Sequence, residues 1–259
     1  MNNIQGDLVL NQPTFEKLQS LRLRAMADAW VAQNKNPTIS ALSFDERFAL
    51  LVDAEHQTRD NRRLTKLQAD AQFRYPNACV EDIEPGSTRG MDKPLLRQIA
   101  GGGWITEHLN LIITGPTGVG KSYFGCAFGQ TACRQRRRVL YRRLPRLLDE
   151  LSLARADGTY ARTLMKLAKT DVLILDDLGL GRLGETQRHD LLEVLEDRYG
   201  RLSTIVTSQL PHETWHEWIG DPTIADAILD RLVHNAYKIN LAGPSRRKNK
   251  ATTTPKPEN

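Results

Sequence analysis

Residues 115–122 have the types and the spacing of a phosphate-binding loop. They read Gly-Pro-Thr-Gly-Val-Gly-Lys-Ser, directly follow an apolar run and open a helical pattern, which together match the P-loop. Glycines let the backbone turn its N–H groups toward an anion, and a helix N-terminus adds partial positive charge. Lys121 is long enough to reach the β and γ phosphates of a nucleotide, and the Ser122 hydroxyl can bind Mg²⁺. The predicted nucleotide contacts are Gly115, Pro116, Thr117, Gly118, Val119, Gly120, Lys121, Ser122 and Tyr123.

Two carboxylates end a second apolar run and could complete this site. Residues 172–175 read Val-Leu-Ile-Leu and are followed by Asp176 and Asp177. We expect Asp176 to hold Mg²⁺ with Ser122, and Asp177 to orient the attacking water and accept its proton. The alternative for Asp177 is an acid that only forms the turn before Gly179.

Ser208 and Gln209 follow a third apolar run, residues 203–207. If that strand lies between the other two, both side chains can hold the attacking water or the γ phosphate. Leu210 and Pro211 begin another helix, so an ordinary capping role for Thr207 and Ser208 is the alternative.

Five short apolar runs alternate with helical patterns and must position these residues. They span 109–114, 139–142, 172–176, 203–207 and 237–241. Such alternation predicts right-handed crossovers and a mostly parallel five-stranded sheet covered on both faces, an α/β fold of three layers.

The first 80 or so residues read as helices only. Thr14 can cap a helix that runs past Trp30, and Ser43 with Glu46 forms a capping box before a long helix. Residues 84–91 contain Pro85, Gly86 and Gly90 and read as a linker. The predicted domains are a helical N-terminal domain for DNA or partner binding (1–85), a nucleotide domain (86–243) and a flexible basic tail (244–259).

The composition excludes several classes of protein. With 259 residues, 40% of them hydrophobic, the chain can bury a core and is neither wholly disordered nor collagen-like. No apolar run reaches the roughly 18–20 residues of a membrane span, and residues 1–10 carry no signal segment. Cys79, Cys126 and Cys133 lack the spacing of a disulfide framework or metal site, so we expect three small apolar residues in a soluble, cytoplasmic protein.

Positive charge is concentrated in one short segment. Seven arginines and no acid occur within residues 134–146, whereas the whole chain has a net charge of only +5. This density favours a polyanionic partner. The alternative is a solvated helix end followed by a strand.

Taken together, these motifs resemble the AAA+ ATPases of the DnaC and DnaA initiator clade, and most of all the IstB-like helper ATPases of bacterial insertion sequences. The resemblance covers nearly the whole chain and rests on residues 115–122, 172–179, 207–211 with Trp215, and 230–232. It implies an AAA+ domain that binds ATP and Mg²⁺. It also implies that Arg231 is an arginine finger acting on the neighbouring subunit's nucleotide, and that Arg247 is a second sensor. Pro244 and Arg246 depart from the usual pattern around Arg247, and the residues after Leu241 leave no room for a full helical lid.

The resemblance further implies that copies assemble side by side around nucleic acid, with ATP between subunits. We expect largely sequence-independent binding of duplex DNA through phosphate contacts. The predicted DNA contacts are Arg137, Arg138, Arg142 and Arg143, with Arg155 or Arg162 as further contacts and Arg59, Arg62, Arg63 and Lys66 as a second surface.

The function expected from the sequence is therefore an ATP-dependent helper of transposition. ATP promotes oligomerisation on target DNA, the assembly presents that DNA to the transposase of the same element, and Mg-dependent ATP hydrolysis releases it. The alternative is a DnaC-like replicative helicase loader. A small-molecule kinase shares the P-loop but needs an acceptor pocket and lid arginines.

Overall fold

The computed structural model describes residues 4–86 and 90–245. The chain forms two compact units, Met1–Thr65 and Lys66–Asn259. By their contacts, residues 66–85 thus belong to the second unit. The division into domains 1–85, 86–243 and 244–259 remains a prediction from the sequence. The basic tail from residue 246 onward, including Arg247, lies outside the described residues.

The first unit is helical, as predicted. Its helices are α1 (Ile4–Ser20), α2 (Arg24–Asn34), α3 (Pro37–Ser40) and the greater part of α4 (Phe44–Ala71). The predicted capping box is confirmed, because the Ser43 N–H donates to Glu46 Oε2 at 2.9 Å and the Glu46 N–H donates to Ser43 Oγ at 3.3 Å.

The prediction of one helix from Thr14 past Trp30 was wrong. The chain is already helical before Thr14, and the helix ends at Ser20. Arg22 adopts a left-handed backbone (φ 61°), and the Leu23 N–H donates to the Leu18 carbonyl at 2.9 Å, which closes the helix. The break therefore occurs without the glycine or proline that would mark it in the sequence.

The second unit is built on a parallel five-stranded sheet, which confirms the predicted fold class. Its strands are β1 (Asn110–Thr114), β2 (Val139–Arg143), β3 (Val172–Leu178), β4 (Ser203–Ser208) and β5 (Ala236–Asn240). The order is β2-β3-β4-β1-β5, and all neighbouring pairs are parallel. Since β4 lies between β1 and β3, the residues that follow these three strands meet at one edge.

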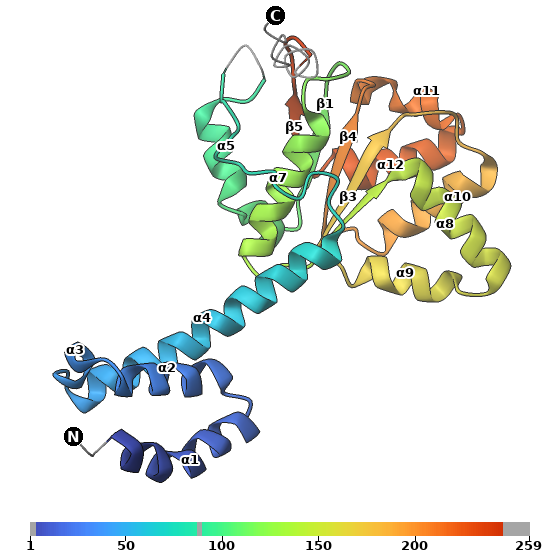
Figure 1. Cartoon of the computed structure of the whole chain (residues 1–259). Coiled ribbons are helices and arrows are strands. Elements are labelled where there is room, and N and C mark those ends of the chain that lie inside the picture. Colours follow the sequence, from blue (N-terminus) through green and yellow to red (C-terminus); the bar gives the residue numbers. More distant parts are fainter. Residues whose placement is uncertain (1–3, 87–89, 246–259) are drawn as a thin grey trace, which may run out of the picture. The chain divides into compact units, whose positions relative to one another are not determined.

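Helices cover both faces of this sheet (Figure 1). They are α5 (Lys93–Ala100), α6 (Gly103–Thr106), α7 (Lys121–Arg134), α8 (Leu144–Asp157), α9 (Tyr160–Ala168), α10 (Glu185–Glu196), the short 3₁₀ helix η2 (His212–Thr214), α11 (Trp215–Ile219) and α12 (Pro222–Val233). Side chains of β2, β3 and β4 pack with those of α8 to α12 in one buried apolar cluster, which includes Trp215. On the other face α7 lies close to the sheet, because a Cβ at Gly125 would touch Thr207, Ile174 and Ile205.

The predicted linker passes the end of β5. The Gly86 N–H donates to the Met91 carbonyl at 2.8 Å. Gly90 has a φ of +76°, and a Cβ there would lie 1.8 Å from the Asn240 carbonyl oxygen. Only glycine fits, because the left-handed backbone and the neighbouring carbonyl both exclude a side chain. In the described part of the chain, no helix has the length and apolar character of a membrane span.

Candidate functional site

The phosphate loop connects β1 to α7 and forms a cradle closed at its base by Lys121. Gly115 has a φ of +142°, and a Cβ there would lie 2.1 Å from the Leu241 carbonyl oxygen, so a side chain is excluded. Lys121 is buried, and its Nζ donates to the carbonyls of Gly115 at 2.7 Å and Pro116 at 2.9 Å. The ammonium group and the N-terminus of α7 therefore provide positive charge where a phosphate would bind.

Asp176 is fully buried at the centre of the site. Its Oδ1 accepts hydrogen bonds from the Ser122 hydroxyl at 2.7 Å and from the Thr207 hydroxyl. Its Oδ2 accepts from the Tyr141 hydroxyl at 2.6 Å and lies 3.5 Å from Arg74 Nη1. Burial, and then the hydrogen bond to Asp176, raise the pKa of Tyr141, which stays a donor. Partners from β2, β4, α7 and the segment after α4 thus converge on one carboxylate.

The donor set fits Mg²⁺. A serine hydroxyl and a carboxylate are the hard oxygen ligands that this ion takes, with phosphate oxygens and water completing its shell. Among the described residues, no cluster of three or more His, Cys, Asp or Glu side chains could hold a metal ion by itself. A magnesium ion at Ser122 and Asp176 would therefore depend on the nucleotide for further ligands.

Asp177 lies beside Asp176 at an irregularity in β3. Its backbone is left-handed (φ 63°), and the β3–β4 register shifts between Leu175 and Leu178. The Asp177 N–H donates to Thr207 Oγ1 at 3.1 Å, and its carboxylate accepts from Arg143 Nε at 2.8 Å. A non-glycine residue in this conformation is strained, and such strain is concentrated at functional sites.

Gln209 reaches the phosphate loop, whereas Ser208 is turned into the protein. The Thr117 hydroxyl donates to Gln209 Oε1 at 2.7 Å. Ser208 is fully buried, donates to the Leu178 carbonyl at 2.7 Å and accepts from the Leu210 N–H at 3.0 Å. Ser208 fits neither prediction: its hydroxyl is buried, and the next helix, η2, begins at His212 with Pro211 as its N-cap and no side-chain hydrogen bond at that cap. Gln209 is placed where it can contact a γ phosphate or its water.

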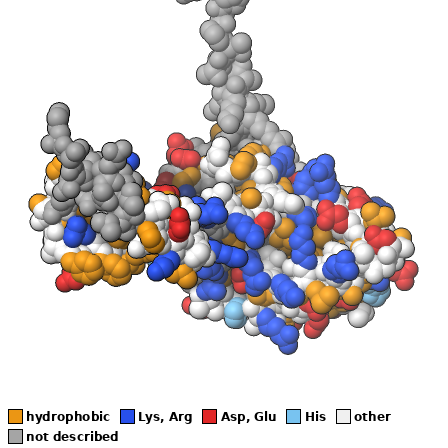
Figure 2. Space-filling model, turned by 60° about the horizontal axis from the view of Figure 1, so that its bottom comes forward, with side chains coloured by type: hydrophobic (Ala, Val, Ile, Leu, Met, Phe, Trp, Pro, Cys, Tyr) orange, Lys and Arg blue, Asp and Glu red, His pale blue; other side chains and the backbone are white. Residues whose placement is uncertain are grey.

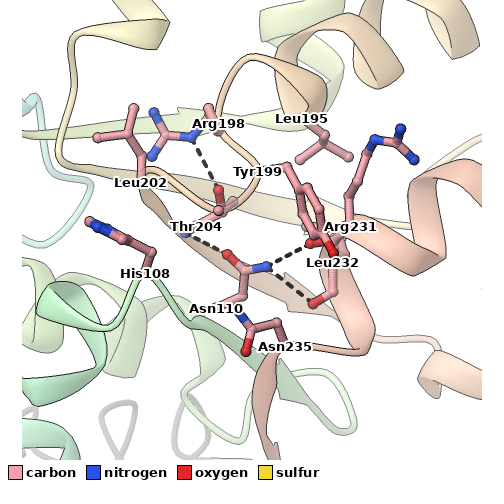
Figure 3. A pocket seen from close by; sticks show the side chains of 11 residues that line it. His108, Asn110, Leu195, Arg198, Tyr199, Leu202, Thr204, Arg231, Leu232 and Asn235 are labelled. Atoms are coloured by element: carbon pink, nitrogen blue, oxygen red, sulfur yellow. Dashed lines mark hydrogen bonds between the residues drawn. The ribbon is translucent and has the colours of Figure 1, made fainter.

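Arg231 lies at the amino end of the sheet, opposite the phosphate loop. Asn110, the first residue of β1, donates from Nδ2 to the Arg231 carbonyl at 2.9 Å. The guanidinium group pairs with Glu196 and lies 5.8 Å from the centre of the Tyr199 ring, and Figure 3 shows it pointing away from Asn110. The cavity at this place has a volume of about 10 Å³, which holds one water molecule at most and no nucleotide.

The four strand-flanking arginines predicted to bind DNA have different surroundings. Arg143 is part of the Asp177 site, and Arg142 pairs with Glu150 at 3.2 Å and is largely buried. Arg138 pairs with Asp171 at 3.3 Å but keeps 59% of its side chain exposed, and Arg137 Nη2 lies 3.5 Å from Thr106 Oγ1. Arg137 and Arg138 are therefore better placed to meet a phosphate than Arg142 and Arg143.

Further cations lie close to Arg138. Figure 2 shows many Lys and Arg side chains on one face of the molecule. A groove of about 410 Å³ is lined in part by Arg138, Arg162, Lys166 and Lys169. Arg155 instead donates to the fully buried Asp190 at 2.9 Å. Of the two further candidates, Arg162 is thus the one that faces a basic groove.

The second predicted DNA surface lies on α4. Arg59, Arg62, Arg63 and Lys66 are all exposed. Arg59 pairs with Glu55 at 2.7 Å and donates to the Arg22 carbonyl at 3.1 Å. The spacing of three to four residues places these cations along one side of the helix.

Sequence reasoning missed Arg74, Tyr141 and the role of Arg143 at Asp177. In the register of the parallel strands β2 and β3, Arg143 lies beside Asp176. Tyr141 lies two residues earlier, on the same side of β2. Two polar residues at alternate positions at the end of a strand were the available signal. This signal indicates a site only when the strand order, with β2 next to β3, is already known.

Comparison with known proteins gives matches over nearly the whole chain. The family model described as "IstB-like ATP binding protein" matches residues 16–254. A Sinorhizobium fredii protein named as an insertion sequence ATP-binding protein is 51% identical over 241 residues, which are 93% of this chain and 98% of that protein. A Pseudomonas fluorescens protein, named as the ATP-binding protein of insertion sequence IS1162, is 50% identical over 206 residues, 80% of this chain and 89% of its own.

Solved structures share the fold at low sequence identity. The DnaC helicase loader has a TM-score of 0.54 and 20% identity, covering 65% of this chain and 99% of that one. AMPPCP-bound DnaA from Aquifex aeolicus has a TM-score of 0.54 and 16% identity, covering 71% of this chain and 57% of that one. These similarities confirm the predicted α/β fold, which the helicase loader and the initiator share with this chain.

Proposed function

The chain belongs to the family of IstB-like ATP-binding proteins, and we propose that it is an ATP-hydrolysing helper of an insertion sequence. Copies of the chain assemble on duplex DNA when ATP is bound, direct the transposase of the same element to that DNA, and dissociate after hydrolysis. The observation that carries the proposal is that the ends of β1, β3 and β4 meet. There the Ser122 hydroxyl lies 2.7 Å from Asp176 Oδ1, and the Thr117 hydroxyl lies 2.7 Å from Gln209 Oε1.

The residues at this edge have distinct roles in hydrolysis. Lys121 and the loop N–H groups neutralise the β and γ phosphates. Asp177 orients a water molecule and accepts its proton as the oxygen of that water bonds to the γ phosphorus, while the bond from the γ phosphorus to the β–γ bridging oxygen breaks and ADP leaves. Gln209 holds the water or the γ phosphate. Ser122 and Asp176 would hold Mg²⁺, which when bound would supply positive charge at the phosphate oxygens.

Arg231 acts on the nucleotide of a neighbouring copy in this proposal. Its backbone is tied to the first residue of β1, whereas the phosphate loop follows the last residue of that strand. Roughly 13 Å of strand separates these two ends, and the guanidinium group points away from Asn110, the first residue of β1 (Figure 3). Within one copy Arg231 is remote from the phosphates, so a role for it requires a second copy.

DNA binding is proposed to occur through phosphates. Arg137 and Arg138 supply the first surface, with Arg162, and the exposed cations of α4 supply the second. Phosphate contacts carry no sequence information, so binding is expected to be largely nonspecific and sensitive to salt.

The relatives favour the transposition helper over the helicase loader. Proteins named for insertion sequences match at 50–51% identity over 80–93% of the chain, whereas the DnaC loader matches at 20% over 65%. The likeness to the loader supports a common fold only.

The proposal is tested by sedimentation with duplex DNA, Mg²⁺ and a non-hydrolysable ATP analogue. We expect assembly only when all three are present, and none with Lys121→Ala, whose Nζ closes the phosphate loop. Lys93→Ala, at an exposed lysine on α5, is the matched control and should assemble normally. Each phosphate contact should add about −0.9 to the slope of log affinity against log salt.

Two outcomes contradict the proposal: assembly that is indifferent to the nucleotide, and DNA affinity that is unchanged between low and moderate salt. Retention of a hexameric replicative helicase, and not of the transposase, in a parallel pull-down would favour the loader instead.

A further inference from the structure

Residues 72–83, which we call the strap, connect α4 to the predicted linker and lie along α7 (Figure 1). The Cys79 N–H donates to the Tyr123 hydroxyl at 3.3 Å, and Gln130 Nε2 donates to the Pro76 carbonyl. A Cβ at Gly129 would lie 2.6 Å from the Phe73 ring, so the strap is packed closely against the helix. The strap is thus attached to the helix that begins at the phosphate loop.

Arg74 extends from the strap to both carboxylates of the site. Its Nη1 lies 3.5 Å from Asp176 Oδ2 and 3.9 Å from Asp177 Oδ2. The hydrogen bonds that Asp176 accepts from Ser122, Thr207 and Tyr141 all come from neutral hydroxyls. A fully buried carboxylate requires compensation of its charge, and Arg74 provides positive charge here.

The two carboxylates hold Arg74 more weakly than they hold the second arginine of the site. Arg143 Nε lies 2.8 Å from Asp177 Oδ2, which is an ordinary charged hydrogen bond. Arg74 has no contact with these carboxylates shorter than 3.5 Å, and 36% of its side chain is exposed. Its guanidinium group can therefore move into solvent without leaving a buried donor behind.

We propose that Arg74 is a placeholder cation that Mg²⁺ displaces from Asp176 when nucleotide binds, so that the strap responds to metal occupancy. This inference rests on the proposed ATPase site. A divalent ion held by Ser122 and Asp176 would bring two positive charges close to the guanidinium group, and their repulsion would act against a long, half-exposed ion pair. The metal also takes over the compensation of the buried carboxylate.

Displacement of Arg74 changes the contacts of the strap with α7. Its neighbour Tyr75 packs against Tyr123, with ring centres 6.0 Å apart. Tyr123 lies in the first turn of α7, directly after the residues that face the phosphates. Loss of the Arg74 contact therefore loosens the strap at the point closest to the nucleotide.

The first test is a Mg²⁺ titration of protein already saturated with a non-hydrolysable ATP analogue. Arg74→Ala removes the competing charge, and an arginine beside a carboxylate shifts proton affinity by one to three pKa units, so we expect half-saturation at roughly tenfold lower Mg²⁺. Arg74→Gln should behave like Arg74→Ala, and Arg74→Lys should behave like the unmodified protein because it keeps the charge.

Arg134→Ala is the matched control. Arg134 holds the far part of the strap through Glu81 at 3.2 Å, and it is the last residue of α7, at the opposite end of the helix from Ser122. This variant loosens the strap without removing the charge beside the carboxylate, so its Mg²⁺ requirement should be unchanged.

The second readout is amide hydrogen exchange of residues 72–79, which reports strap mobility and not activity. In the unmodified protein, adding Mg²⁺ to the analogue complex should raise exchange in this segment several-fold. In Arg74→Ala the exchange should be high with and without Mg²⁺.

Three outcomes overturn the inference. Arg74→Ala could need as much Mg²⁺ as the unmodified protein or more, Arg134→Ala could equal Arg74→Ala, or the strap amides could be slowed by Mg²⁺. Any of these with normal analogue binding leaves the ATPase proposal standing. Failure of the unmodified protein to retain the analogue at any Mg²⁺ concentration overturns both.

Discussion

Two charged side chains are buried almost completely at opposite ends of the same sheet. Asp176 has no exposed surface and lies where β3 ends, whereas Arg198 is 1% exposed and lies below the start of β4. Arg198 donates to the carbonyls of Leu167 at 2.7 Å and Thr170 at 2.9 Å, to that of Ser203, and to the Thr204 hydroxyl at 3.1 Å. Asp176 is bonded to side-chain hydroxyls, and Arg198 mainly to the backbone.

The kind of partner separates a binding site from a structural contact. Side-chain hydroxyls can rotate and exchange a carboxylate for a metal ion, so the partners of Asp176 suit a change of ligand. Backbone carbonyls are fixed by the fold, so Arg198 joins the end of α9 to the starts of β3 and β4 permanently. Burial lowers the pKa of Arg198 to about 9, and within residues 4–86 and 90–245 its hydrogen bonds are to carbonyls and one hydroxyl, not to a carboxylate. Burial and charge alone therefore do not identify the functional end of the sheet.

The largest expected effect is a loss of ATP turnover at the end of the sheet where Arg198 lies. It would show that this end is not purely structural. Arg231 lies at the Arg198 end, and Arg231→Ala should lower ATP turnover by about 10³ to 10⁵ with nucleotide affinity unchanged, as for other arginine fingers. Steady-state hydrolysis in the presence of DNA measures this.

Mixing two inactive variants shows whether Arg231 acts between copies. An Asp177→Asn copy supplies an intact Arg231 to the intact site of an Arg231→Ala copy, so the mixture should regain part of the activity. A mixture as inactive as its components would count against action in trans.

Asp177→Asn should lower hydrolysis by about 10² to 10⁴ while ATP binding and assembly remain, because only the proton acceptor is lost. Complexes with DNA should then persist longer, which a filter-binding chase would measure. The free energy of unfolding should change little, since an amide keeps the size and can still accept from Arg143. A normal rate of hydrolysis would remove Asp177 from the mechanism.

Arg198→Met should lower the free energy of unfolding by about 2 to 4 kcal/mol, because buried carbonyls lose their donors. Urea denaturation measures the loss, and the folded protein should bind ATP with unchanged affinity. Arg201→Met, at an exposed arginine nearby, is the control and should change stability by about 0.5 kcal/mol at most. Weaker ATP binding by stable Arg198→Met would show that the two ends of the sheet are coupled.

The smallest expected effect concerns the rates at which the cysteines are alkylated. Cys126 and Cys133 both lie on α7, which packs on the sheet. Burial raises the pKa of Cys126, near Asp176, to about 11 and that of Cys133 to about 12. Both thiols stay protonated at pH 8, so iodoacetamide should label the half-buried Cys79 first. Cys126 and Cys133 are both almost completely buried, so each should be labelled much more slowly than Cys79. Mass spectrometry of labelled peptides would reveal the reverse order.

The elements that could be predicted from the sequence are those with local signals. The phosphate loop, the five strands and the capping box at Ser43 are specified by consecutive residues or by fixed spacings. The break at Arg22 had no such signal, because arginine does not favour a left-handed backbone.

The contacts across the site depend on which strands are neighbours. Arg143 was expected on a DNA-binding surface, but the β2–β3 register brings it to Asp177. Arg74 reaches Asp176 across 102 positions of sequence, through a strap whose path is set by packing on α7. Neither contact has a periodicity or motif that a linear sequence can show.

Gly90 shows that an indispensable glycine need not belong to a nucleotide site. Its absent side chain leaves room for the Asn240 carbonyl, in the same way that Gly115 leaves room for that of Leu241. In a saturation mutagenesis screen, both positions should reject every replacement. At Gly90, however, the variants would be lost because the chain misfolds and not because a nucleotide contact is missing. A position that tolerates no substitution in this chain can therefore mark a close approach of two backbone segments as well as a ligand contact.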